Sequence, residues 1–170
     1  MNTVVISFIA DDKPGLVNLI STTVSQHDGN WLESSLSHLA GKFAGVVVVQ
    51  ISAEKAEALI GSLKALSDKG IRLNAEIASS GATEVEYRAA TLDLIGHDKP
   101  GIVRDISNTL AQMGVNLAKL TTEIAPGSMS SELLFKAQGQ LQIPTTTDIH
   151  DLQEAIERLA SDLMVDIEIE

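Results

Sequence analysis

A four-residue turn that occurs twice carries the groups most able to bind a small charged molecule. The sequence Asp-Lys-Pro-Gly stands at residues 12–15 and again at residues 98–101. Glycine leaves backbone N–H groups open to close approach, and N–H groups at a helix start bind anions such as carboxylates. The repeated turn therefore suggests a ligand that bears a carboxylate.

An asparagine lies at the same distance from each turn. Asn30 and Asn116 each follow the proline of their copy by sixteen residues. A side-chain amide offers both a donor and an acceptor, which suits the two charged ends of an α-amino acid. We expect the returning chain to bring each asparagine towards the turn of its own copy or of a symmetric neighbour. A simple turn at residues 28–30 is the alternative interpretation.

Each turn is predicted to start a helix. Proline suits the first helical position, so Pro14 and Pro100 are placed there, with Asp12 and Asp98 beside the positive end of the helix dipole. A glycine in the first helical turn costs about 0.5 to 1 kcal/mol relative to alanine. Two explanations stay open for this glycine, namely packing against a neighbouring strand or close approach of a ligand.

The candidate ligand-binding residues combine the turn, the first backbone N–H groups of the helix and the asparagine. They are Asp12, Pro14, Gly15, Leu16 and Asn30 in the first copy and Asp98, Pro100, Gly101, Ile102 and Asn116 in the second.

The repeat extends beyond the turn at a constant offset of 86 residues. The apolar positions of the two predicted helices correspond as well, at Val17, Ile20, Val24 and His27 in the first copy and Val103, Ile106, Leu110 and Met113 in the second. This spacing is typical of one face of an amphipathic helix. Such self-similarity indicates a duplicated structural unit.

Strand and helix patterns alternate in the same order in both halves. Strands are predicted at 3–10 and 88–96, second helices at 54–68 and about 148–162, and a hairpin turn at Gly41. The order β-α-β-β-α-β, read twice, predicts an α+β protein of two ferredoxin-like domains with antiparallel sheets.

We place the first domain at residues 1–79, a linker at 80–87 and the second domain at 88–170. The second copy is longer by about six residues, and we expect the segment 139–148 to hold this insertion in a surface loop.

Composition narrows the classes of function. The chain has no cysteine, which excludes disulfides and thiol chemistry and fits a reducing, cytoplasmic location. Its formal net charge is -11, and an acidic surface disfavours direct binding to DNA or RNA. The charge is uneven, with 6 basic and 8 acidic side chains in residues 1–80 against 6 and 15 in residues 81–170. A basic partner would be steered to the second half.

The turn, the helix and the glycine-asparagine start of the second strand resemble the ACT domain family, whose members are small-molecule sensors of amino-acid metabolism. The resemblance covers nearly the whole chain as two tandem copies. The segment GNWLESSLSHLAGKFAGVVVV at 29–49 is most similar to tandem-ACT repressors of the glycine cleavage system. In amino-acid-binding members, the resemblance implies a ligand at the turn between strand one and helix one, commonly across an interface of two ACT units.

Two departures from serine-sensing members stand out. Those members carry histidine four residues before the proline, where this chain has Ala10 and Gly96, and asparagine where it has Asp12 and Asp98. His97 lies one position later, and it is interpreted as an exposed turn residue, with replacement of the family histidine as the alternative. The aspartates favour the ammonium of a ligand and disfavour its carboxylate, so the ligand is expected to lie differently.

The function expected from these features is amino-acid sensing without catalysis or cofactor. The resemblance implies a repressor that responds to glycine or another small amino acid, and that acts through a protein partner such as a DNA-binding activator. A regulatory subunit or scaffold of an amino-acid metabolic enzyme is the alternative. An enzyme is disfavoured because the sequence contains neither a recognisable nucleophile motif nor metal-ligand spacing among its four histidines. A homodimer is expected by analogy.

Overall fold

The computed structural model describes residues 1–79, 84–129 and 131–170, and it divides the chain into two compact units. The first unit spans Met1–Ala82 and the second spans Thr83–Glu170. Part of the predicted linker, residues 80–83, lies outside the described residues. Residues 84–86 have no regular secondary structure, and the first strand of the second unit begins at Tyr87. The linker at 80–87 stays a prediction.

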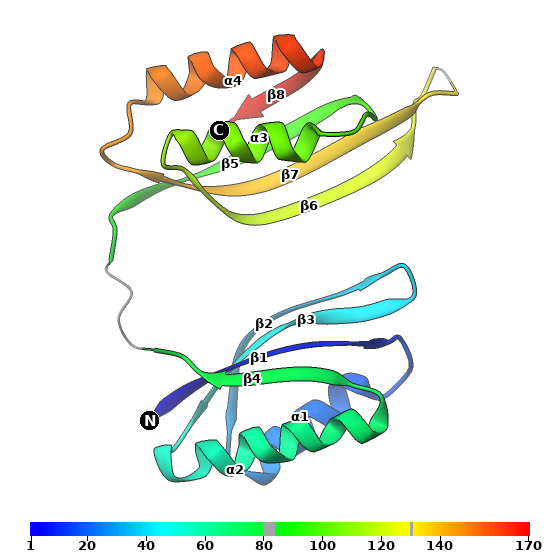
Figure 1. The fold of residues 1–170 in the computed structure, drawn as a ribbon, viewed down its shortest axis with the longest axis vertical. Coiled ribbons are helices and arrows are strands. Elements are labelled where there is room, and N and C mark those ends of the chain that lie inside the picture. The colour runs from blue at the N-terminus through cyan, green and yellow to red at the C-terminus, as the bar shows by residue number, and fades with distance from the viewer. Residues whose placement is uncertain (80–83, 130) are drawn as a thin grey trace. The chain divides into compact units, whose positions relative to one another are not determined.

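The two units have the same order of strands and α-helices, and the first has one 3-10 helix in addition (Figure 1). The elements of the first are β1 (Asn2–Asp11), α1 (Leu16–Gln26), β2 (Asn30–Leu39), β3 (Lys42–Ile51), α2 (Ala53–Lys64), the 3-10 helix η1 (Ala65–Lys69) and β4 (Arg72–Ile77). Those of the second are β5 (Tyr87–His97), α3 (Ile102–Gln112), β6 (Asn116–Pro126), β7 (Leu133–Pro144), α4 (Ile149–Leu163) and β8 (Val165–Ile169).

Each unit is an antiparallel sheet with two helices on one face (Figure 1). The strand order is β2-β3-β1-β4 in the first sheet and β6-β7-β5-β8 in the second. The predicted α+β class and the ferredoxin-like β-α-β-β-α-β arrangement are therefore confirmed.

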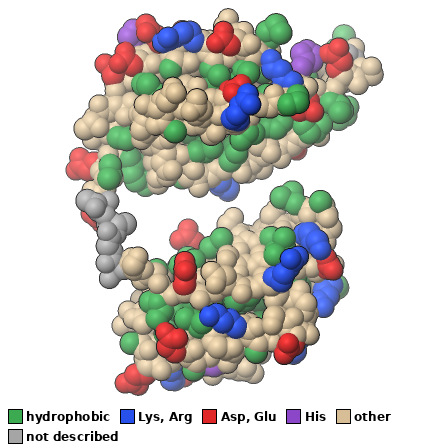
Figure 2. Space-filling model, in the orientation of Figure 1, with side chains coloured by type: hydrophobic (Ala, Val, Ile, Leu, Met, Phe, Trp, Pro, Cys, Tyr) green, Lys and Arg blue, Asp and Glu red, His purple; other side chains and the backbone are tan. Residues whose placement is uncertain are grey.

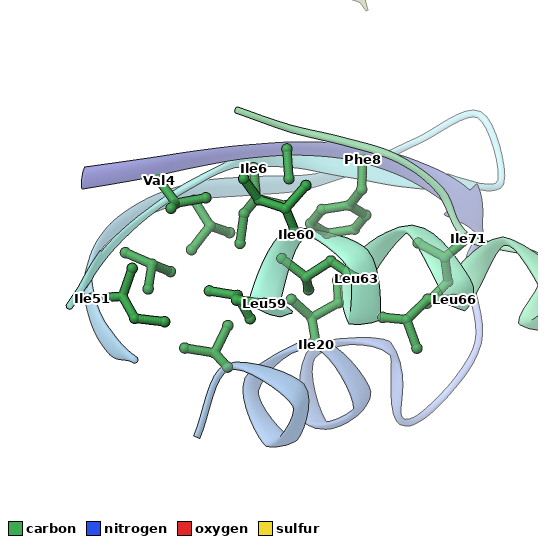
Figure 3. Close-up of a cluster of buried hydrophobic side chains, with 14 of the residues drawn as sticks. Val4, Ile6, Phe8, Ile20, Ile51, Leu59, Ile60, Leu63, Leu66 and Ile71 are labelled. Carbon is green, nitrogen blue, oxygen red and sulfur yellow. The ribbon is translucent and has the colours of Figure 1, made fainter. Parts of the chain in front are cut away.

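The core of each unit lies between its sheet and its helices. Alternate residues of β1 point inwards, because successive side chains of a strand face opposite sides, and Val4, Ile6 and Phe8 are 5% exposed or less. They face Ile20 of α1 and Leu59 of α2 (Figure 3). Burying one such side chain stabilises the fold by about 1.5 to 3 kcal/mol.

The apolar stripe of the first helices differs from the prediction by one residue. Val17 and Val103 were expected on the buried face, but each is 42% exposed. Leu16 and Ile102 take their place in the core, at 3% and 2% exposed. The helices begin at these residues rather than at the prolines, while Ile20, Val24, Ile106 and Leu110 lie in the core as predicted.

The predicted insertion has the right approximate length but the wrong place. Residues 139–144 continue β7 instead of forming a loop, and Leu141 and Ile143 are buried. The extra residues lie in the β6–β7 hairpin, where residues 127–132 join the paired Pro126 and Leu133. The equivalent hairpin of the first unit has the two-residue turn Ala40–Gly41, with both residues at positive φ. The predicted turn at Gly41 is thus confirmed.

Candidate ligand-binding turns

The two turns have the same backbone geometry. Gly15 has φ 95° and ψ -1°, and Gly101 has φ 93° and ψ -1°. These are the angles of the third residue of a type II turn, which takes proline just before it and glycine at this place. Each glycine is the N-cap of its helix. The predicted positions of Pro14 and Pro100 within the helix are therefore wrong, because both precede the N-cap.

The positive φ supplies a reason for glycine that the sequence did not reveal. An L-residue with a side chain is strained in this conformation. A Cβ atom built at Gly15 meets nothing within 4 Å, and one at Gly101 meets only the side chain of Arg104. Packing against a neighbouring strand, one of the two predicted explanations, is therefore wrong.

Backbone N–H groups are the chemistry that these helix starts offer. The first helical hydrogen bonds run from Leu19 N to Gly15 O (2.9 Å) and from Asp105 N to Gly101 O (3.0 Å). The N–H groups before them lack helical partners, and no described side chain caps either helix. The side chains of Leu16 and Ile102 are buried, so these predicted contacts can use only the backbone.

The aspartates of the two turns do not cap the helices as expected. The carboxylate Oδ2 of Asp12 lies 2.5 Å from Nδ1 of His38 on β2. The backbone N–H of Asp12 donates to Gly41 O, and that of Asp98 donates to Leu133 O. The backbone N–H of each aspartate is thus hydrogen-bonded to the β2–β3 or β6–β7 hairpin of its own unit.

The lysines of the turns make one contact that both copies share. Nζ of Lys13 donates to the carbonyl of Lys69 at the end of η1 (3.5 Å), and Nζ of Lys99 donates to the carbonyl of Leu163 at the end of α4. A cation at the C-terminal end of a helix is favourable because the last carbonyls lack partners and carry partial negative charge. Each lysine therefore joins the start of one helix to the end of the other.

The asparagines lie at the opposite end of the sheet from the turns. Asn30 pairs with Gln50 of β3, which in turn pairs with Thr3 at the start of β1. The turn follows Asp11 at the other end of β1, and eight residues of strand span about 27 Å. Asn116 has the same place in the second sheet, and its Nδ2 donates to Oε1 of Gln142 (2.8 Å).

Two predicted arrangements of the asparagines must therefore be separated. Within one unit, the asparagine does not reach the turn, so this form of the predicted site is wrong. Contact between the asparagine of one unit and the turn of another stays a prediction.

The residues four positions before the two prolines, Ala10 and Gly96, are small and face the core. Ala10 is 5% exposed, and a Cβ atom at Gly96 would lie 2.3 Å from Cγ1 of Val165. His97 is exposed and its Nδ1 lies 2.9 Å from Oε2 of Glu132. Neither Ala10 nor Gly96 carries an imidazole, but His38 of β2 lies against Asp12 in the first turn.

The position of one cation, Arg104 beside the second turn, was not predicted from the sequence. A Cβ atom at Gly101 would lie 2.8 Å from Nη2 of Arg104, so the guanidinium lies beside the bare backbone of the second turn. The signal was present in the sequence, because arginine in the first turn of a helix opposes the helix dipole.

A further charged pair lies beside the first turn. Hydrogen bonding and charge attraction from Lys42 lower the pKa of Asp11 below its ordinary value of 3.8. Asp11 is therefore ionised at neutral pH. Because both side chains are exposed to water, the pair stabilises the fold only weakly.

A hollow of the second unit lies away from its turn. It has a volume of about 650 Å³ and is open on the uncovered face of the sheet. The residues around it include Asp93, Lys136, Asp166 and Glu168, and none belongs to a DKPG turn. Asp12, Pro14 and Gly15 of the first turn are exposed, as are Asp98 and Pro100 of the second.

Two further findings concern the part of the chain that the structure describes. No group of three or more His, Asp or Glu side chains there is arranged to hold a metal ion. None of its helices is both long and apolar enough to cross a bilayer.

The fold and the repeated turn define a tandem pair of ferredoxin-like domains with the same helix start in each. A family model of the ACT domain matches residues 2–77. The first unit is thus similar to the ACT domain family over most of its length. The second unit repeats the strand order and the turn of the first.

Two solved structures match over nearly the full length. The first is an unknown protein from Galdieria sulphuraria, with a TM-score of 0.86, 25% identity, and coverage of 99% of this chain and 97% of that one. The second is named "putative glycine cleavage system transcriptional repressor", with a TM-score of 0.70, 18% identity, and coverage of 99% and 96%. At 18% identity the likeness concerns the fold alone. A comparison with curated protein sequences gives no significant match.

Proposed function

We propose that this protein is a non-enzymatic regulator that binds a small amino acid, glycine first, at its DKPG turns. The observation that carries the proposal is the uncapped helix start behind a left-handed glycine, present twice in an ACT architecture. A carboxylate bound there would accept hydrogen bonds from backbone N–H groups and would be stabilised by the helix dipole. No cofactor is needed for this role.

The exposed turns fit a ligand that is closed in by a second ACT unit. One unit presents the turn at one end of its sheet and the asparagine at the other. Asn30 or Asn116 can therefore contact the ligand only if it comes from a unit other than the one that holds the turn. A homodimer would supply such units, and it remains part of the proposal.

Charge supports an indirect route from the ligand to gene expression. The net charge is -11, and residues 81–170 carry 15 acidic against 6 basic side chains. Acidic and basic side chains are interspersed on the visible face of each unit (Figure 2). The net negative charge, most of it in residues 81–170, favours a basic protein over nucleic acid as a partner. Repression of glycine cleavage through a DNA-binding activator fits this charge and the name of the second matching structure.

The ligand can change partner binding only through a difference in affinity. If glycine binds one arrangement of the domains more tightly than another, it shifts the population towards that arrangement. The partner's affinity then changes by the same coupling free energy, typically about 1 to 3 kcal/mol.

Calorimetric titration of the full chain with glycine, serine, alanine and other small amino acids tests ligand binding. We expect saturable binding of at least one of them, with glycine the tightest. If none binds at millimolar concentration, amino-acid sensing is ruled out.

Capture of partners from cells grown with and without glycine tests the repressor role. We expect a DNA-binding protein whose recovery depends on glycine. Recovery of a metabolic enzyme instead would favour a regulatory subunit.

A further inference from the structure

The second sheet has one face that no helix of its own unit covers. Helices α3 and α4 pack on the other face (Figure 1), where Leu92, Leu94 and Ala137 are buried. Because successive side chains of a strand alternate, Asp93 and Ile95 of β5 point to the uncovered side, and both are exposed. The inner strands β5 and β7 are hydrogen-bonded on both sides, so this face offers side chains and no free strand edge.

Acidic side chains predominate on the uncovered face, around the hollow of about 650 Å³. The charged residues there are Asp93 on β5, Glu123 on β6, Lys136 on β7, and Asp166 and Glu168 on β8. Lys136 lies directly across from Glu123 and offsets its charge. Asp93, Asp166 and Glu168 have no basic residue directly across from them in the sheet.

Two of these carboxylates oppose each other. Asp93 and Glu168 pair in register across β5 and β8, and like charges directly opposite in a sheet are destabilising. Among the described residues, no ion pair includes Asp93, Asp166 or Glu168. A cationic group brought to this face would therefore relieve a repulsion that the protein alone leaves in place.

The equivalent face of the first sheet lacks these charges. The two sheets have the same register, so each position on one face has a counterpart on the other. The counterparts of Asp93, Glu123, Asp166 and Glu168 are Ser7, Ser37, Arg72 and Asn74. The same fold thus accepts a neutral or basic face at these positions, and the acidic face is a property of the second unit rather than of the topology.

We infer that the uncovered face of the second sheet is a docking surface for a basic amphipathic helix of the partner protein. A helix is the element that packs on a sheet face, whereas an extended peptide adds to a sheet edge. Ile95 is 40% exposed on the inner strand β5 and would contact an apolar residue of that helix. Lysines or arginines beside the apolar residue would meet Asp93, Asp166 and Glu168. The inference rests on the proposed function and names the surface that its protein partner binds.

Calorimetric titration of the full chain with a synthetic helical peptide tests this surface. The probe has about 18 residues, enough for a helix in water, with a stripe of leucines flanked by lysines. The control peptide has glutamate in place of every lysine. We expect the wild type to bind the lysine peptide and not the glutamate peptide. Binding should weaken as the salt concentration rises, because exposed charges are screened.

Matched variants separate the face from the general acidity of the chain. Asp93→Ser together with Glu168→Asn installs the residues of the first sheet, and it should weaken binding of the lysine peptide by about tenfold or more. Glu157→Gln together with Asp162→Asn removes the same number of carboxylates from exposed positions of α4, on the other side of the sheet, and should leave binding unchanged. Circular dichroism at the titration temperature checks that every variant is folded.

Three results would overturn the docking surface, namely no binding of the lysine peptide by the wild type, unchanged affinity in the Asp93→Ser, Glu168→Asn variant, or equal weakening in both double variants. Glycine titration of the same variants measures amino-acid sensing separately, because none of the replaced residues belongs to a DKPG turn. Loss of the docking surface with intact glycine binding would leave the sensing role standing. Absence of binding by any amino acid to the wild type would instead overturn the proposed sensing.

Discussion

Gly15 and Gly101 show how one backbone angle can determine which type of residue a position accepts. Both glycines adopt φ above 90° at the N-cap, where a type II turn meets a helix. Serine, aspartate or asparagine is the usual N-cap, because its side chain satisfies a free N–H group. In this turn the N-cap is a left-handed glycine, so no N-cap side chain accepts a hydrogen bond from the first N–H groups of the helix.

Replacing Gly15 with alanine tests conformational strain separately from packing. The new methyl group would meet nothing within 4 Å, so only the φ of 95° opposes it. We expect a loss of about 1 kcal/mol in the free energy of unfolding, measured by urea denaturation. Gly61→Ala is the matched control, because Gly61 lies within α2 with open space around it, and there alanine should stabilise by about 0.5 to 1 kcal/mol. Equal effects of the two variants would refute the role of φ.

At the scale of elements, sequence periodicity predicted the type and order of the helices and strands better than it predicted where they end and which strands pair. Alternation in β1 and the apolar spacing of α1 identified both elements, because each buries one face against the core. The segment 139–144 was misread because Gly139 and Pro144 usually mark loops, yet a Cβ atom at Gly139 would lie 2.9 Å from Cδ1 of Leu117. Its glycine permits close packing inside the sheet.

The positions of the asparagines could not be predicted for a different reason. The order β2-β3-β1-β4 places Asn30 beside the start of β1. Strand order depends on contacts between distant residues, which local patterns do not encode. The turns were therefore found from sequence, whereas their distance from the asparagines, and the approach of Arg104, required the fold.

The C-terminal caps of the second helices make an element-scale prediction. Gly70 ends η1 with φ 83°, whereas Met164 ends α4 with φ 52°. Met164 is 79% exposed, so its side chain contributes little packing. We expect Met164→Gly to stabilise the protein by about 1 kcal/mol in urea unfolding, because it relieves the left-handed strain. The reciprocal Gly70→Met should destabilise, and a loss of stability in Met164→Gly would contradict the assignment.

At the scale of the whole molecule, the chain contains two separate cores. One core is built from residues of the first unit and the other from residues of the second. The two halves also differ in charge, because residues 81–170 hold 15 of the 23 acidic side chains. Structural independence would allow the two copies to take different tasks after duplication.

Core truncation in one unit tests this independence. Leu92 is 1% exposed, and Leu92→Ala should cost about 2 to 5 kcal/mol in the second unit. Amide hydrogen exchange should then rise in β5, β7 and α3 while β1, β3 and α1 stay protected. Ile6→Ala, the equivalent change in the first unit, should give the reverse pattern. Loss of protection throughout the chain in either variant would show a single cooperative unit.

The lysine of each turn donates a hydrogen bond to a main-chain carbonyl oxygen. The residue that supplies this oxygen can therefore be of any type. The acceptor residue is a lysine in one copy, Lys69, and a leucine in the other, Leu163. Every residue at that position supplies the same carbonyl. The sequences at the two helix ends can therefore differ while the hydrogen bond is kept. This explains how the same DKPG turn occurs beside acceptor segments of different sequence.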